Sequence, residues 1–171
     1  DLPQKLEDAG GWANRATAEA FADYSLACAE EFGDRVNNWI TLNEPWCVAW
    51  LGYSIGVHAP GKKDHSLAIA ASHHTALAHS MAARSIKSIR PNAQVGLTVN
   101  MTNHHLENPE NSELVTLNAL LDSNINRWWI EAMLHGKYPT NILEYYGKAL
   151  TDVLIQGDQE LLKSTPDYLG I

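Results

Sequence analysis

Apolar residues recur at every third or fourth position in two long stretches of the chain, which is the spacing of a helix with one buried face. The first stretch predicts a helix over residues 14–32, which Asn14 can cap and Gly33 can end. The second predicts a helix over residues 66–89, which ends before Pro91. The apolar faces are Phe21, Tyr24, Cys28 and Phe32 in the first helix and Leu67, Ala70, His74, Leu77 and Met81 in the second.

Short apolar runs between these helices have the length and composition of strands. Residues 36–42 are rich in Trp, Ile and Thr and are predicted to form a strand that is buried on both faces. Residues 94–100 and 168–171 have the same character. The rest of the pattern predicts a loop marked by Gly52, Gly56, Pro60 and Gly61, a polar loop over 103–113, and helical stretches over 114–135, 141–147 and 158–163.

The alternation of strands and helices is typical of βαβ units and predicts an α/β fold with a parallel sheet. No internal repeat or linker divides the chain, so residues 1–171 are expected to form a single segment of one domain. The pattern fits an open doubly wound sheet and part of a closed barrel equally well, because both are built from right-handed βαβ units. With 171 residues, the chain is shorter than the roughly 250 of a complete (β/α)8 barrel.

Composition argues against two classes of partner. Hydrophobic residues make up 45% of the chain, yet no apolar run approaches the roughly 20 residues that span a bilayer, so no membrane partner is expected. The formal net charge is −8, and Lys62-Lys63 is the only adjacent pair of basic residues. Proteins that bind nucleic acid concentrate Lys and Arg on one face, so no nucleic-acid partner is expected either.

Cysteine usage and the chain ends bear on location. Cys28 and Cys47 show neither C-x-x-C spacing nor the density of a disulfide scaffold, which favours free thiols in a reducing compartment. The chain begins at Asp1 without Met or an apolar targeting segment, so a cytoplasmic location is expected. The apolar run Tyr168–Ile171 resembles a strand that continues, and both ends are expected to be internal to a longer protein.

The segment Thr41–Pro45 places an amide beside a carboxyl at the end of a predicted buried strand. In barrel enzymes, catalytic groups lie at this end of the strands. A carboxyl near Trp39, Trp46 and Trp50 is partly desolvated, which favours its protonated form and suits it to act as a general acid. Cleavage of a glycosidic bond needs such an acid, and Asn43 could bond a sugar hydroxyl more strongly as the transition state forms. These residues predict a sugar site.

At this point the sequence resembles glycoside hydrolase family 1, the β-glucosidase and β-galactosidase group. One five-residue motif could arise by chance, but many motifs in the family's order over the whole chain do not. These motifs are Asp1–Gln4, Gly10–Arg15, Asn38–Cys47, Gly52-Tyr53, His58–Gly61, His73-His74 through Ala78-His79, Gly96–Asn100, Arg127–Trp129, Gly136–Pro139 and Asp167–Ile171.

The resemblance implies the fold and the reaction. The fold would be a partial (β/α)8 TIM barrel that holds roughly strands four to six with the intervening helices. The activity would be that of a β-glucosidase-type hydrolase, which cleaves terminal β-linked glucosides or oligosaccharides by a retaining double displacement. No cofactor is implied.

The resemblance also assigns roles to residues. Glu44 would be the acid/base, and Asn43 would bind the 2-hydroxyl of the glycon. The entrance where the leaving group sits would be lined by Trp46, Cys47 and Leu51, and Asn100 would reach the same region from the next strand.

The family's second carboxylate is missing from this chain. It lies in a T-E-N-G setting on a later strand, and the glutamine, histidine, late tryptophan and late glutamate that hold the glycon are missing as well. Glu107-Asn108-Pro109 has Pro where that motif has Gly and lies in a predicted polar loop, so it is not expected to be the nucleophile. Retention needs two carboxyls about 5–5.5 Å apart, so the isolated chain is predicted to be inactive.

Several residues that invite other functions are expected to be structural. His73, His74 and His79 lack the i, i+4 spacing of a zinc-binding pair, so no metal is expected. Cys47 has no His and Asn/Asp arrangement that would make it a nucleophile, and it is predicted to be a wall of the pocket. Packing in the core, rather than sugar binding, is expected for Trp12, Trp39, Trp128 and Trp129.

Two alternatives to the β-glucosidase hypothesis remain at this stage. The chain could be a catalytically incomplete folded fragment or an interaction module, because open barrel edges expose unpaired backbone groups that favour self-association. If it is part of an enzyme, the preferred sugar could instead be a β-galactoside or a 6-phospho-β-glucoside, because that choice depends on segments outside the chain.

Overall fold

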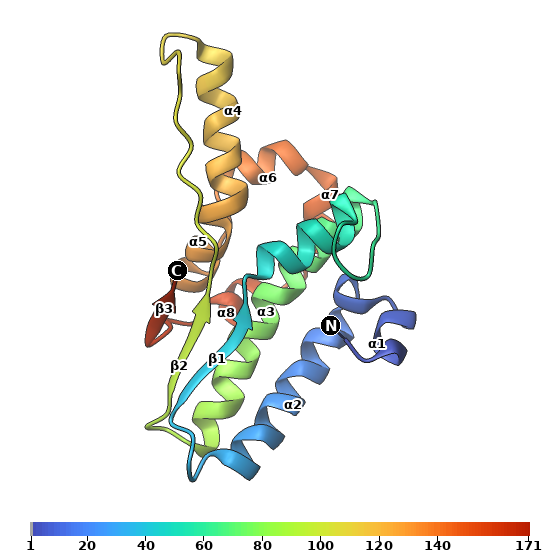
Figure 1. Cartoon of the computed structure of the whole chain (residues 1–171), viewed down its shortest axis with the longest axis vertical. Helices are drawn as coiled ribbons and strands as arrows, with labels where there is room; N and C mark the ends of the chain where they lie inside the picture. The colour runs from blue at the N-terminus through green and yellow to red at the C-terminus, as the bar shows by residue number, and fades with distance from the viewer. Residues whose placement is uncertain (1) are drawn as a thin grey trace.

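The computed structural model describes residues 2–171, and within them three parallel strands form one small sheet (Figure 1). The strands are β1 (Asn38–Asn43), β2 (Gln94–Thr98) and β3 (Tyr168–Gly170), in the order β1-β2-β3. Both strand pairs are parallel, with Asn38 opposite Gln94 and Gly96 opposite Tyr168. Helices connect each strand to the next, so the predicted α/β fold with a parallel sheet is confirmed.

Helices occupy most of the chain. The longest are α2 (Arg15–Phe32), α3 (His65–Ile89) and α4 (Ser112–Asp122). The shorter ones are α1 (Gln4–Asp8), η1 (Gly11–Ala13), η2 (Cys47–Ile55), η3 (Ser123–Arg127), α5 (Trp128–His135), α6 (Thr140–Tyr146), α7 (Lys148–Thr151) and α8 (Asp158–Leu162). The helices predicted over 14–32, 66–89, 141–147 and 158–163 are present, and the stretch 114–135 is helical throughout as α4, η3 and α5.

The helix ends follow from side-chain caps. Asn14 Oδ1 accepts the Ala16 N–H at 3.0 Å at the start of α2, and Asp64 Oδ1 accepts the Ser66 N–H at 2.8 Å at the start of α3. The short helices α1, η1 and α7 were not predicted, because helices of three to five residues show little of a helical period.

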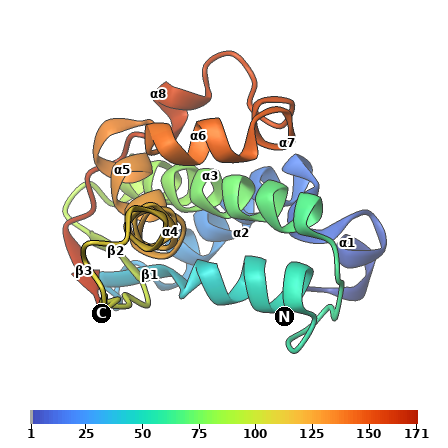
Figure 2. The ribbon, with the colours of Figure 1, turned by 90° about the horizontal axis from the view of Figure 1, so that it is seen from above.

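The central helix α3 packs against the sheet, α2 and η2. Small residues allow this close packing, since Ala68, Ala71, Ala78 and Ala82 are fully buried. Figure 2 shows α3 between the sheet on one side and α6 and α8 on the other. The helix therefore forms the middle layer of the molecule.

The opposite face of the sheet has no helical layer among the described residues (Figure 2). Val95 and Leu97 of β2 are 1% and 2% exposed, but Ile40 of β1 is 53% exposed. The prediction that 36–42 is buried on both faces is therefore wrong. Side chains alternate along a strand, and here only one side of the sheet is covered.

The segment after β1 also differs from expectation. Its glycines predicted a loop, but Cys47–Ile55 forms a helix of π type, which ends at Gly56 with φ +77°. Gly52 lies inside this helix, and a Cβ there would approach the Ala59 carbonyl oxygen to 2.7 Å. Gly52 thus marks a close approach between the helix and the chain that follows it, not a turn.

A buried ionic cluster joins α3 to α2 and α8. Asp158 Oδ1 lies 2.8 Å from Arg15 Nη2, and Asp158 Oδ2 lies 2.9 Å from His73 Nε2. His73 Nδ1 lies 2.8 Å from the Tyr138 hydroxyl. Burial lowers the pKa of His73 to about 4, so the ring is neutral at pH 7, accepts the Tyr138 O–H and donates to Asp158. The cluster ties three helices together in the interior.

Candidate active site

Glu44 lies directly after β1, in a backbone conformation that is rare for a side-chain-bearing residue. Its φ is +46°, the only positive φ among the described non-glycine residues. Three hydrogen bonds hold this conformation: the Glu44 N–H donates to the Thr98 carbonyl at 2.8 Å, and its carbonyl accepts the N–H groups of Cys47 (2.9 Å) and Val48 (3.3 Å). Glu44 is therefore fixed both to the neighbouring strand and to the first turn of η2.

The β1–β2 pairing is irregular between Ile40 and Asn43, just before this residue. Such an irregularity changes the direction in which the following side chains point. Strain of this kind is found at functional sites, where the surrounding structure compensates for it. The local structure thus turns the Asn43 and Glu44 side chains out of the regular alternation of the strand.

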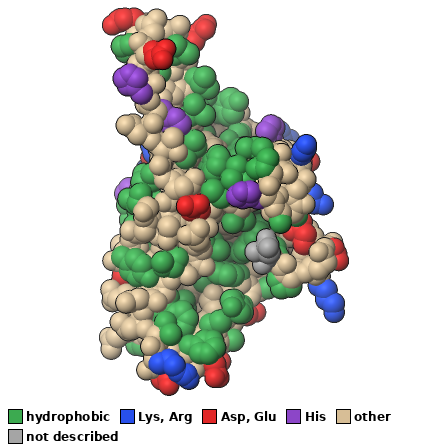
Figure 3. All heavy atoms as spheres, in the orientation of Figure 1, with side chains coloured by type: hydrophobic (Ala, Val, Ile, Leu, Met, Phe, Trp, Pro, Cys, Tyr) green, Lys and Arg blue, Asp and Glu red, His purple; other side chains and the backbone are tan. Residues whose placement is uncertain are grey.

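Asn43 and Glu44 both line a cleft of about 790 Å³. Figure 3 shows the face of the molecule with the uncovered sheet, on which hydrophobic and uncharged side chains dominate, although an acidic group also lies near its middle. The remaining lining residues come from η2, from the N-terminal segment and from the chain after η2: Cys47, Val48 and Tyr53; Leu2, Gln4, Glu7 and Trp12; and His58, Ala59 and Pro60.

Cys47 is in direct contact with the Glu44 carboxylate. Its thiol donates a hydrogen bond to Glu44 Oε2, with 3.4 Å between sulfur and oxygen. Burial, together with this bond and the charge of Glu44, raises the pKa of the Cys47 thiol to about 11. Cys47 is thus a protonated donor at neutral pH. Neither Cys47 nor Cys28 is in a disulfide, as the sequence predicted.

Tyr53 closes one wall of the cleft. Its hydroxyl donates to Glu7 Oε2 at 2.7 Å and accepts the Trp12 N–H at 2.9 Å. Burial raises the pKa of Tyr53, and the hydrogen bond to Glu7 raises it further. A Cβ on Gly11, whose φ is +56°, would collide with the Glu7 carboxylate and the Tyr53 hydroxyl. The hydrogen bonds of the Tyr53 hydroxyl to Glu7 and Trp12 join the N-terminal segment to η2.

Sequence reasoning did not identify Glu7, Tyr53 or His58 as cleft residues. The glycine pair before Trp12 was the only local signal, because it marks a place where the backbone needs room. Tyr53, which bonds to both Glu7 and Trp12, is more than 40 residues away from them, so the sequence alone could not bring these residues together.

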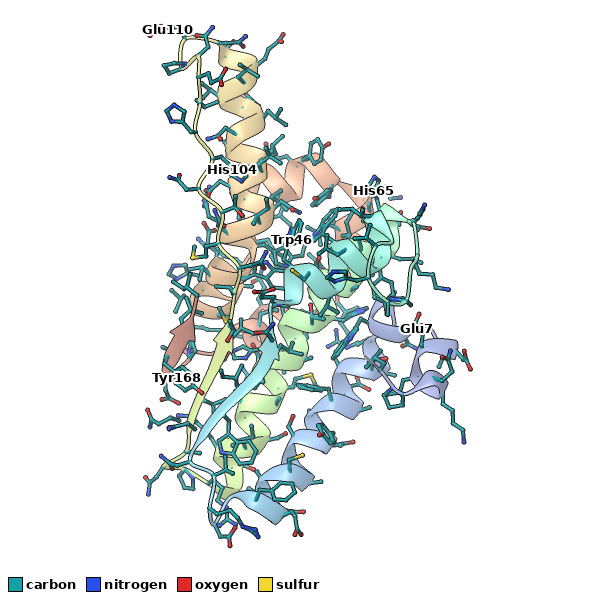
Figure 4. The ribbon with its side chains drawn as sticks, viewed as in Figure 1. Glu7, Trp46, His65, His104, Glu110 and Tyr168 are labelled. Atoms are coloured by element: carbon teal, nitrogen blue, oxygen red, sulfur yellow. The ribbon has the colours of Figure 1, made fainter. Side chains whose placement is uncertain are left out.

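Of the predicted site residues, the cleft brings together Asn43, Glu44 and Cys47, but Trp46, Leu51 and Asn100 do not line it. Trp46 Nε1 donates to Asn124 Oδ1 of η3 at 3.0 Å, and Trp46 lies well away from Glu7 in Figure 4. Successive helical side chains diverge by about 100°, so Trp46 and Cys47 face different neighbours. Asn100 lies just after β2, and its Oδ1 is buried without a hydrogen-bond partner among the described residues.

Most of the other tryptophans pack in the interior. Trp128 and Trp129 are each 1% exposed and Trp39 is half-buried, in agreement with the packing prediction, whereas Trp12 is buried but also lines the cleft. Trp50 stacks on Tyr146, with 6.1 Å between the ring centroids, and does not line the cleft. Trp46 and Trp50, which were expected to desolvate Glu44, thus contact η3 and α6.

Two further observations concern metals and membranes. Within residues 2–171, no three His, Cys, Asp or Glu side chains are placed as the ligands of a metal ion would be. Likewise, none of the helices in this part of the chain combines the length and the apolar character needed to cross a membrane.

Comparison with known proteins gives consistent results. The family model "Glycosyl hydrolase family 1" matches residues 1–171. Beta-glucosidase A of Acetivibrio thermocellus is 37% identical over 171 residues, which cover 99% of this chain and 38% of that protein. Beta-glucosidase A of Thermotoga maritima is 34% identical over 100% of this chain and 38% of its own length.

Solved structures also resemble the fold of this chain closely. The psychrophilic beta-glucosidase BglU from Micrococcus antarcticus superposes with a TM-score of 0.95 at 38% identity, over 99% of this chain and 36% of that one. The virulence factor SghA, in complex with its substrate analog salicin, gives a TM-score of 0.93 at 30% identity over 99% and 37%. The chain thus spans less than two fifths of the length of these relatives.

Proposed function

The chain belongs to glycosyl hydrolase family 1, and we propose that it carries the acid/base part of a β-glucosidase active site. The observation that carries this proposal is Glu44, which is held at the end of β1 by backbone bonds on both sides and faces a cleft beside Asn43. A half-buried carboxyl that lines a cleft at this end of a parallel strand is well placed for proton transfer.

The proposed reaction is a retaining double displacement on terminal β-linked glucosides. Glu44 protonates the glycosidic oxygen as the leaving group departs and then removes a proton from the incoming water. Asn43 donates to the 2-hydroxyl of the glycon. The relatives named beta-glucosidase and the salicin complex of SghA support a glucoside substrate, with β-galactosides and 6-phospho-β-glucosides as the alternatives.

The nucleophile belongs to a segment outside this chain. Glu7 is the other carboxylate that lines the cleft among the described residues, but its Oε2 accepts the Tyr53 hydroxyl, which fixes it to the cleft wall. Because retention requires two opposed carboxyls, the 171 residues by themselves are inactive.

Residues 1–171 would be a single segment of a (β/α)8 TIM barrel, with β1, β2 and β3 as roughly strands four, five and six. The parallel order β1-β2-β3 with helices between the strands supports this assignment. Thr98 accepts the Glu44 N–H, so the ends of β1 and β2 are adjacent, and Asn100 follows two residues later. Asn100, Trp46, Cys47 and Leu51 would then surround the leaving group in the complete barrel.

Two free thiols fit a reducing compartment, and we assign the protein to the cytoplasm on that ground. A second candidate function is self-association. In this alternative the isolated chain is a folded fragment that pairs with another copy through the open edge of β1, the outer strand of the sheet. The exposed side chain of Ile40 on that strand favours this alternative.

The test is a chimera in which residues 1–171 replace the matching segment of the Thermotoga maritima enzyme, which then supplies the rest of the barrel. The chimera should hydrolyse an aryl β-glucoside with retention, and Glu44→Gln should lower the rate about 10²–10⁴-fold. The loss should be smaller for a dinitrophenyl glucoside, whose leaving group needs no proton. Glu113→Gln, an exposed residue of α4, is the control. A folded chimera that keeps full activity with Glu44→Gln contradicts the proposal.

A further inference from the structure

The Glu44 carboxylate has one side-chain partner among the described residues, and that partner is a thiol. Cys47 Sγ donates to Glu44 Oε2 at 3.4 Å, within the hydrogen-bond range for sulfur. The two residues are three positions apart, and Cys47 N also donates to the Glu44 carbonyl at 2.9 Å. The backbone bond therefore fixes the thiol relative to the residue that it contacts.

The placement of this thiol is specific. Glu44 has a left-handed φ of +46°, and its carboxylate contacts Cys47 in the first turn of η2. Both residues line the same cleft, so the hydrogen bond lies at the surface that a substrate would reach. Glu7, the other carboxylate of this cleft, is held in a comparable way by the Tyr53 hydroxyl at 2.7 Å. Each carboxylate thus has its own donor.

We propose that Cys47 is a positioning residue, which holds Glu44 Oε2 by its S–H group and leaves Oε1 to exchange the proton with the substrate. The catalytic meaning of this inference rests on the proposed function, but the hydrogen bond itself does not. The thiol remains a donor at neutral pH, because burial and the neighbouring carboxylate raise the pKa of Cys47 to about 11. Cys47 takes no part in bond making and does not act as a nucleophile.

The hydrogen bond can be tested in the 171-residue chain without any activity. In a Cys28→Ser background, Cys47 is the sole thiol, and its alkylation by iodoacetamide at pH 8.5 can be followed by mass spectrometry. Only the thiolate reacts, so removal of the facing negative charge by Glu44→Gln should speed alkylation about two- to tenfold. Glu7→Gln removes a carboxylate from the same cleft that is bonded elsewhere, and it should change the rate less than twofold. Equal rates in Glu44→Gln and the reference chain overturn the inference.

The positioning role is tested in the chimera by a double-mutant cycle. Cys47→Ala should lower kcat about two- to tenfold with a smaller effect on KM, and Cys47→Ser, which keeps a donor, should recover most of that loss. In the Glu44→Gln background Cys47→Ala should have no further effect. Val48 lines the same cleft but has no hydrogen-bond donor in its side chain, so Val48→Ala is the control. Its effect on kcat should be equal with Glu44 and with Glu44→Gln.

The outcomes separate the two hypotheses. If Glu44→Gln speeds alkylation but leaves the activity of the chimera unchanged, the hydrogen bond stands and the proposed function fails. If Glu44→Gln abolishes activity while Cys47→Ala costs the same in both backgrounds, the proposed function stands and the positioning role is wrong.

Discussion

At the scale of single residues, Glu44 illustrates how a strained position is compensated. A left-handed backbone costs a non-glycine residue on the order of 1–3 kcal/mol. Glu44 satisfies both of its backbone groups in that conformation, with one bond to β2 and two to η2. The same bonds fix the direction of the side chain, so the strain is linked to the position of the carboxylate in the cleft.

Tyr53 makes two hydrogen bonds with one hydroxyl, and its loss should therefore be costly. Tyr53→Phe leaves the Trp12 N–H and the Glu7 carboxylate without their partner, which should lower the free energy of unfolding by about 1–3 kcal/mol. Urea unfolding measures this change. Tyr145→Phe, a residue that is 67% exposed, is the control and should stay within about 0.5 kcal/mol. Equal effects of the two substitutions would mean that the Tyr53 contacts do not form.

Gly11 combines a positive φ with a crowded site. Gly11→Ala should destabilise the chain by more than about 2 kcal/mol, because a Cβ meets both Glu7 and Tyr53 in addition to the backbone strain. Gly157 also has a positive φ, +96°, but nothing lies within 4 Å of its added Cβ. Gly157→Ala should therefore cause backbone strain alone. Its loss of stability, measured by thermal or urea unfolding, should be clearly smaller than that of Gly11→Ala.

At the scale of elements, α3 carries buried histidines that bond to its neighbours. His73 contacts Asp158 of α8, and His79 Nδ1 lies 2.7 Å from Thr41 Oγ1 of β1. Burial lowers the pKa of both imidazoles to about 4. The hydrogen bonds of Arg15, the Ile155 N–H and His73 lower the pKa of Asp158 despite its burial. These contacts hold the layer of helices against the strand that leads to Glu44.

These pKa shifts predict that acid destabilises the fold. In the unfolded chain the imidazoles take up protons near pH 6.5, but in the fold they do so only near pH 4. The unfolded chain therefore binds more protons between these pH values, and stability should fall by a few kcal/mol from pH 7 to pH 4.5. Urea unfolding at several pH values measures the slope. His79→Asn should reduce it, and the exposed His105→Asn should not. A flat profile would contradict the burial of both histidines as neutral rings.

Among the elements, η2 shows what local sequence could and could not predict. Asn43 and Glu44 were identified correctly as the end of a strand, because a short apolar run stops there. The helix that follows was missed, because Gly52 and Gly56 are typical of loops and the apolar residues of 46–55 show no clear period. Packing on α3 stabilises η2 in spite of these glycines, and the helix places Cys47 in the cleft.

At the scale of the whole molecule, the small sheet leaves apolar surface uncovered. Ile40 is 53% exposed on the open face and belongs to a strand whose outer edge is unpaired among the described residues. An exposed, apolar strand edge favours pairing with another chain.

Self-association through this edge should be sensitive to a single charge. Ile40→Lys should lower the self-association of the isolated chain without lowering its stability by more than about 0.5 kcal/mol, because the side chain is largely exposed. Sedimentation velocity over a range of concentrations measures the association. Leu117→Lys on the projecting helix α4, at 52% exposure, is the matched control and should leave association unchanged. If only the control substitution reduces association, the contact lies on α4 and not on the sheet.

The sequence by itself determined the α/β class, the long helices, the strands and the family, because periodicity, caps and ordered motifs are local signals. It also predicted that Asn43, Glu44 and Cys47, which lie within five residues of one another, share one site, and the structure places all three on one cleft. Only the tertiary structure decided which face of the sheet is open, that η2 is helical, and that Glu7, Tyr53 and His58 share the cleft with Glu44. These features depend on contacts between residues far apart in the chain, and a local pattern of hydrophobic and polar residues does not contain that information.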